Sequence, residues 1–207
     1  MSVKLNQVRF KLRIFNEKTD LEILGEILHN VFESLIIYEK DLFFNFLPEE
    51  ELVKVFTKYL NKALAFYPEP LPKRKLFLEK GLEILKNVFK NKEIKKLKSL
   101  ISDAEIFEEV LGFFKNIKAG TSEGICYVKP DLLLKKGNNW IILEFKLHKP
   151  SSEEQLEEYK DFLQKFGQND NIKIYLVIFE PFKIEKYEFS SKSYSYPSQL
   201  SLFEDFS

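Results

Sequence analysis

The chain of 207 residues contains a single cysteine, Cys126. One cysteine cannot form an intrachain disulfide, and it excludes a zinc site built from several cysteines. This usage is typical of a reducing compartment, so we expect a cytoplasmic protein. The sequence also has no long uncharged apolar run and no signal peptide, so we expect a soluble protein without a membrane partner.

A net charge is also missing, because 32 Lys and Arg residues are matched by 32 Asp and Glu residues. A neutral chain argues against a broad, sequence-independent coat around DNA, although it leaves room for a local basic groove. No Gly-rich phosphate loop ending in Lys-Ser or Lys-Thr is present, so the chain carries no ATPase motor of that kind. There is no internal repeat, and the length fits one domain followed by a tail.

The most informative stretch lies in the second half of the chain. Residues 131–135 and 140–147 are rich in apolar, β-branched and aromatic side chains, and Gly137-Asn138-Asn139 separates them. This pattern predicts a β-hairpin. Because side chains alternate along a strand, we expect Glu144 and Lys146 on one face and an apolar set on the other.

Asp131 begins the first strand of this hairpin, where it can come close to Glu144. Two carboxylates offer hard oxygen ligands for Mg²⁺ or Mn²⁺, and a neighbouring lysine can orient a water or offset charge on phosphorus. A solvated strand face with alternating charges would give the same spacing. The residues therefore indicate a metal site only in combination with further motifs.

The rest of the chain predicts helices, then a strand-rich half. Asp20 reads as an N-cap of a helix through Leu35, residues 41–100 read as mainly helical with a break at Pro68, Pro70 and Pro72, and residues 3–15 read as a strand or an extended arm. Ser151 and Glu154 have capping-box spacing before a helix to about Phe166. Residues 172–179 predict a buried strand, and residues 184–189 an edge strand.

Pro130-Asp131 followed by Glu144-Phe145-Lys146 resembles the signature of the PD-(D/E)XK nuclease superfamily, and Gln155-x-x-x-Tyr159 resembles the extra motif of its RecB-like branch. The resemblance implies an α/β fold with a mixed central sheet flanked by helices, and here with an added N-terminal helical region. It implies a single nuclease domain over residues 1–189, with residues 20–100 helical and residues 101–189 forming the catalytic sheet.

The same resemblance implies the roles of individual residues. Gly25, four residues before His29, is similar to the opening helix of the branch, in which the histidine is a metal ligand. The implied ligands of Mg²⁺ or Mn²⁺ are then His29, Asp131, Glu144 and the backbone carbonyl of Phe145. Lys146 would assist the attacking water, and Gln155 and Tyr159 would position the DNA strand. Glu109 is the implied acid on the preceding strand, with Glu108 as its competitor.

Basic residues outnumber acids between Lys73 and Lys98. A charge run of this kind is usually a solvated helix face, but it is also the best local source of phosphate contacts, and we take Lys92, Lys95 and Lys96 as candidate DNA-binding residues.

The tail, residues 190–207, has a disordered composition and contains Gln199-Leu200-Ser201-Leu202-Phe203. This pentapeptide resembles the peptide by which bacterial proteins bind the β sliding clamp, with Leu202 and Phe203 as apolar anchors and Gln199 setting the register. The alternative is that the segment packs on its own domain.

Two functions follow from the sequence. The first is a metal-dependent DNA nuclease, expected to be an exonuclease in repair or recombination, that is recruited to the clamp and works alone or with a separate helicase subunit. The second is a non-catalytic adaptor that binds DNA ends or a helicase and docks on the clamp.

Overall fold

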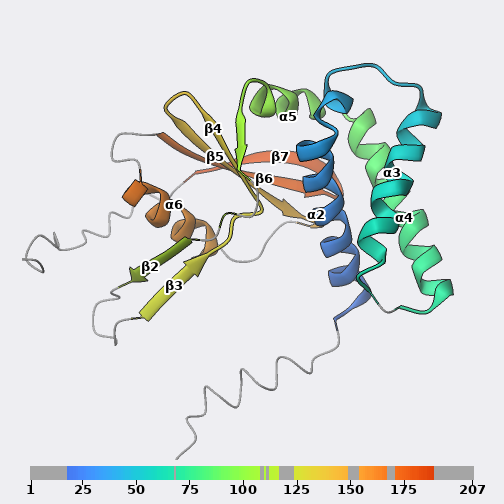
Figure 1. The fold of residues 1–207 in the computed structure, drawn as a ribbon, viewed down its shortest axis with the longest axis horizontal. Coiled ribbons are helices and arrows are strands. Elements are labelled where there is room, and N and C mark those ends of the chain that lie inside the picture. The colour runs from blue at the N-terminus through green and yellow to red at the C-terminus, as the bar shows by residue number, and fades with distance from the viewer. Residues whose placement is uncertain are drawn as a thin grey trace, which may run out of the picture.

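The computed structural model describes residues 18–67, 69–107, 110, 112–116, 124–148, 154–166 and 171–188. The first half is helical and the second half is built around a sheet (Figure 1). The helices are α2 (Asp20–Tyr38), the 3-10 helix η1 (Lys40–Phe43), α3 (Glu49–Leu64), α4 (Leu71–Lys90), α5 (Ile94–Ile101) and α6 (Glu154–Phe166). The strands are β1 (Glu105–Phe107), β2 (Gly112–Asn116), β3 (Gly124–Val128), β4 (Leu132–Lys136), β5 (Asn139–Lys146), β6 (Asn171–Phe179) and β7 (Phe182–Tyr187).

The main sheet has five strands in the order β1-β4-β5-β6-β7. Strand β4 is antiparallel to both β1 and β5, whereas β5 and β6 are parallel, and β7 is antiparallel to β6. Helix α6 lies between the two parallel strands in the chain, as a parallel connection requires. The α/β class with a mixed, helix-flanked sheet is therefore confirmed, while the two-stranded sheet of β2 and β3 was not predicted.

The predicted hairpin is formed by β4 and β5, with Leu132 opposite Leu143 and Lys136 opposite Asn139. Gly137 occupies the turn with a φ of 55°, a left-handed conformation that glycine adopts without a steric cost. The two faces of β5 divide as the alternation predicts. Ile141, Leu143 and Phe145 belong to the core beneath the N-terminal helices, whereas Ile142 packs in the cluster around α6.

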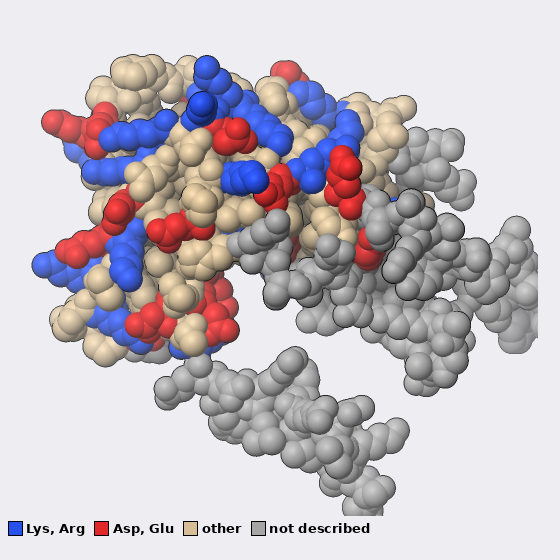
Figure 2. Space-filling model, turned by 180° about the vertical axis from the view of Figure 1, so that it is seen from behind, with Lys and Arg blue, Asp and Glu red and all other residues tan. Residues whose placement is uncertain are grey.

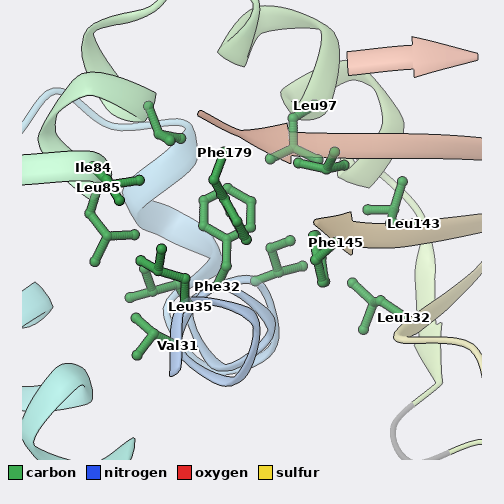
Figure 3. Packing of buried hydrophobic residues seen from close by; sticks show 14 of the residues in the cluster. Val31, Phe32, Leu35, Ile84, Leu85, Leu97, Leu132, Leu143, Phe145 and Phe179 are labelled. Atoms are coloured by element: carbon green, nitrogen blue, oxygen red, sulfur yellow. The ribbon is translucent and has the colours of Figure 1, made fainter. Parts of the chain in front are cut away.

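The larger core joins the helical half to the sheet. In α2, the apolar residues recur at helical spacing, and Phe32 makes edge-on ring contacts with Phe145 of β5 and Phe179 of β6. Figure 3 shows these rings between α2 and the strands, together with Leu85 of α4 and Leu97 of α5. Helix α2 is thus fixed against the end of β5 by aromatic packing, and this contact determines where its polar face lies.

Three predicted boundaries are corrected by the structure. The N-cap of α2 is Thr19 rather than Asp20, because Thr19 and Glu22 exchange hydrogen bonds in a capping box. Helix α4 begins at Leu71, so Pro72 lies in its first turn, where a missing N–H costs nothing. The edge strand is Phe182–Tyr187 and so begins two residues before the predicted start at Ile184.

Several predictions lie outside the described residues. They are the segment 3–15, the acids Glu108 and Glu109, the cap at Ser151 and the whole tail from residue 190. Among the residues that the structure describes, no helix combines the length and the apolar character needed to cross a membrane.

Candidate metal-binding and catalytic site

Asp131 stands just before β4 and is held by the backbone of β5. Its Oδ2 accepts a hydrogen bond of 2.7 Å from the N–H of Phe145. Leu132 pairs with Leu143, so the register places Asp131 across from Glu144 on the same face of the hairpin. The two carboxylates that the sequence analysis selected are therefore neighbours.

His29 reaches the same place from a different layer. Helix α2 presents its imidazole so that Nε2 lies 3.3 Å from Asp131 Oδ1. The ring also packs edge-on against Phe145, with centroids 5.5 Å apart, and this contact limits its orientation. A Cβ on Gly25 would lie 3.5 Å from Leu147 Cβ. Gly25 therefore faces Leu147, just after β5, at an ordinary van der Waals distance.

Glu144 is the one buried charged residue among the described positions, with 1% of its surface exposed. Its Oε1 accepts a hydrogen bond of 2.7 Å from Lys146 Nζ. Its Oε2 is buried without a hydrogen-bond partner in the described part of the chain. A buried carboxylate oxygen without a partner costs free energy, so this atom is suited to a ligand that supplies positive charge.

The pKa values of Asp131, Glu144 and His29 are shifted because the three groups are buried close to one another. Burial raises the pKa of Asp131 to about 6, against a lowering effect from the Phe145 N–H and Lys146. Burial and then repulsion by Asp131 raise the pKa of Glu144, opposed by Lys146. Burial lowers the pKa of His29, which keeps the imidazole neutral and its ring nitrogen available as a ligand at neutral pH.

These residues fit a hard divalent cation. The donor set of two carboxylates and a neutral imidazole is one that Mg²⁺ or Mn²⁺ accepts, and the partnerless Oε2 of Glu144 is the atom such an ion would neutralise. No group of three or more His, Cys, Asp and Glu side chains within the described ranges is already arranged to hold an ion. Small side-chain rotations would be needed, because Glu144 Oε1 is turned to Lys146. Phe145 contributes its N–H to the site, and its carbonyl as a ligand stays a prediction.

Tyr159 has a structural place that the motif alone does not reveal. Its side chain is 1% exposed, and its hydroxyl donates a hydrogen bond of 3.1 Å to the carbonyl of Lys129. Lys129 lies two residues before Asp131, so Tyr159 fixes the segment that carries this acid. The role of Tyr159 in positioning DNA stays a prediction. The side chain of Gln155 lies outside the described residues.

The candidate DNA-binding lysines lie away from the carboxylates along the chain, at the start of α5. Lys92 and Lys95 are exposed. Lys96 donates to the carbonyl of Ile184 at 2.7 Å and lies over the ring of Tyr175, so it ties α5 to the sheet. Figure 2 shows acidic side chains among the Lys and Arg side chains of one face. A DNA contact of these lysines stays a prediction.

Glu33 is a residue that the sequence analysis left without a role. It lies one turn after His29 in α2, with Oε2 3.9 Å from His29 Nε2. The available signal was its i, i+4 spacing from His29, which places the two side chains on one helix face. Glu109 and the pentapeptide 199–203 are outside the described residues, so nothing is established about where they lie.

A scan against models of protein families finds none that matches this chain, and a search of curated proteins finds no significant match.

Proposed function

We propose that this protein is a metal-dependent DNA nuclease of the PD-(D/E)XK type. The observation that carries the proposal is the convergence of four side chains at the C-terminal end of β5. His29 lies 3.3 Å from Asp131, and Lys146 lies 2.7 Å from Glu144, while Glu144 retains a buried oxygen without a partner in the described residues. A charged residue buried on a central strand destabilises a fold unless its charge is used or compensated.

The division of labour follows from the positions of the residues. Asp131, Glu144 and neutral His29 would hold a Mg²⁺ or Mn²⁺ ion, with the Phe145 carbonyl as a further ligand implied by the family resemblance. Such an ion would polarise a phosphate oxygen and lower the pKa of a bound water.

Lys146 supplies a cation beside the metal ligands. Its side chain is partly exposed, so a phosphodiester can reach Lys146 Nζ while Nζ keeps its ion pair with Glu144. From there the ammonium group can orient the attacking water or offset negative charge that develops on phosphorus. Tyr159 acts on Asp131 indirectly by holding the Lys129 carbonyl.

The competing function is an adaptor that binds DNA ends or a helicase without cutting. An adaptor has no need of a lysine paired with a buried acid next to a neutral imidazole, so the presence of all four groups favours catalysis. The two functions are separated by digestion of labelled DNA by the purified protein in the presence of Mn²⁺.

The decisive comparison is between Lys146→Ala and Lys183→Ala. Lys183 forms an equivalent pair with Glu185, two residues on in β7, so its replacement breaks the same kind of contact on an edge strand. We expect Lys146→Ala to lower the cleavage rate by about 100-fold or more and Lys183→Ala to leave it unchanged. Equal residual activity in wild type and Lys146→Ala would reject the catalytic function and favour the adaptor.

We also propose that the segment Gln199 to Phe203 recruits the protein to the sliding clamp, on the strength of its sequence alone. Deleting these five residues should abolish capture of the protein by immobilised clamp while leaving DNA cleavage unchanged. Unchanged capture would reject the peptide as the anchor.

A further inference from the structure

The face of α2 that carries His29 also carries Glu33 one turn later. Residues four apart on a helix are neighbours, and Glu33 Oε2 lies 3.9 Å from His29 Nε2. Asp131 Oδ1 lies 3.3 Å from that same ring nitrogen. One imidazole nitrogen therefore faces carboxylate oxygens on two sides, one from its own helix and one from the hairpin.

Neither separation is that of a good hydrogen bond, since N–H···O bonds are about 2.7–3.2 Å long. Adjacent ligand atoms around a six-coordinate ion with bonds of about 2.1–2.3 Å are separated by roughly 3.0–3.3 Å. The His29–Asp131 distance of 3.3 Å matches this spacing, and the His29–Glu33 distance of 3.9 Å exceeds it only modestly. Rotation of the Glu33 side chain, or one intervening water, closes the difference.

Glu33 and Asp131 are also close enough to repel each other. Glu33 Oε2 and Asp131 Oδ1 both lie within 3.9 Å of His29 Nε2. Neighbouring carboxylates of like charge destabilise the folded protein unless a cation lies between them. The side chains of Glu33 and His29 are 24% and 28% exposed, so a hydrated ion can approach them from solvent.

We propose that Glu33 is a further member of the cation site, holding the ion directly or through one water on the α2 side. The inference rests on the proposed function, because it assigns a residue to the same ion. The two glutamates of the site also differ in their exposure to solvent. Glu144 would be the buried ligand of the ion, and Glu33 would be the ligand accessible from solvent.

Binding of Mn²⁺ to the full-length protein tests this without a cleavage assay. The free ion is measured by electron paramagnetic resonance for wild type, Glu33→Gln, Glu144→Gln and Glu83→Gln. Glu83→Gln is the control, because it makes the same chemical change at an exposed position of α4. We expect Glu33→Gln to raise the Kd for Mn²⁺ about tenfold, Glu144→Gln to abolish binding, and Glu83→Gln to leave the Kd unchanged.

The melting temperature without metal should be no lower in Glu33→Gln than in wild type, because the variant loses the repulsion between Glu33 and Asp131, and this separates loss of a ligand from loss of structure. If Glu33→Gln does not fold, Glu33→Ala removes the same carboxylate with a good helix former and should give the same loss of affinity. Wild-type affinity in the Glu33 variants, with binding lost in Glu144→Gln, overturns the role of Glu33 and leaves the proposed nuclease intact. A wild-type protein that binds no Mn²⁺ overturns both.

Discussion

His29 and Asp131 belong to different layers of the fold, yet His29 Nε2 lies 3.3 Å from Asp131 Oδ1. Aromatic packing of Phe32 fixes α2 against the sheet, and the Phe145 N–H fixes Asp131 against β5. The pair is therefore assembled by packing that is independent of any ion. Such preorganisation lowers the cost of binding a cation, because the ligands do not have to be gathered first.

The affinity for Mn²⁺ should fall as the pH is lowered through 6. Protons compete with the ion for carboxylates, and burial raises the pKa of Asp131 to about 6. One proton with this pKa weakens binding about tenfold between pH 7 and pH 5, and the raised pKa of Glu144 adds to the effect. Titration calorimetry at several pH values measures it. An affinity that is constant over this range would contradict the assignment of Asp131 as a ligand.

Asp131→Asn should stabilise the protein in the absence of metal at pH 8. The folded-state pKa of Asp131 is raised above its ordinary 3.8, so its charged form destabilises the fold above about pH 6. The shift from 3.8 to about 6 corresponds to up to roughly 3 kcal/mol in the free energy of unfolding. Asparagine keeps an acceptor for the Phe145 N–H.

The stabilisation should shrink as the pH falls through 6 and vanish below about 3.8, where the carboxyl is protonated in both folded and unfolded chains. Thermal melts of wild type and variant in a chelator, over pH 5 to 8, give this difference. His29 is present in both wild type and Asp131→Asn, so its own titration contributes less to the difference in stability between them than to either stability alone. A variant that is less stable than wild type at pH 8 would show that the Asp131 charge is already compensated.

Tyr159→Phe should weaken Mn²⁺ binding although Tyr159 is not assigned as a ligand. The variant loses the hydrogen bond to the Lys129 carbonyl, which costs about 1 kcal/mol of stability and loosens the segment before Asp131. We expect a several-fold rise in the Kd for Mn²⁺ and a lower cleavage rate.

The matched control is Tyr187→Phe. Tyr187 lies on the edge strand β7, and its hydroxyl donates a hydrogen bond of 3.4 Å to Glu157 on α6. It should lose stability to a similar or smaller extent and bind Mn²⁺ as wild type does. Equal losses of affinity in both variants would mean that Tyr159 acts through general stability and not through Asp131.

Local features of the site could be predicted from the sequence. The position of Glu144 and Lys146 on one face of β5, and the nearness of Asp131, follow from strand alternation and a glycine turn. The nearness of His29 depends on how α2 packs on the sheet, and only the family resemblance indicated it. Burial and hydrogen bonding also lay beyond the sequence. No pattern indicates that the Tyr159 hydroxyl bonds the Lys129 carbonyl, or that Glu144 is left with a buried oxygen.

The elements of the fold could be predicted from the sequence to a similar extent. Periodicity identified the helices and the buried strand β6, because each has a continuous apolar face. The pairing of β2 with β3 was missed, since the connection between them, residues 117–123, contains Gly120 but is longer than the roughly two to five residues that identify a simple hairpin. The cap at Thr19 was displaced by one residue because Thr19 and Asp20 are both good N-caps, and only the hydrogen bonds to Glu22 distinguish them.

A crystal structure of the protein grown with Mn²⁺ tests the central claim most directly, because the anomalous signal locates the ion. We expect one ion bonded at about 2.0–2.4 Å to His29 Nε2 and to an oxygen of both Asp131 and Glu144. An imidazole remote from both carboxylates, with no ion bound between them, would contradict it.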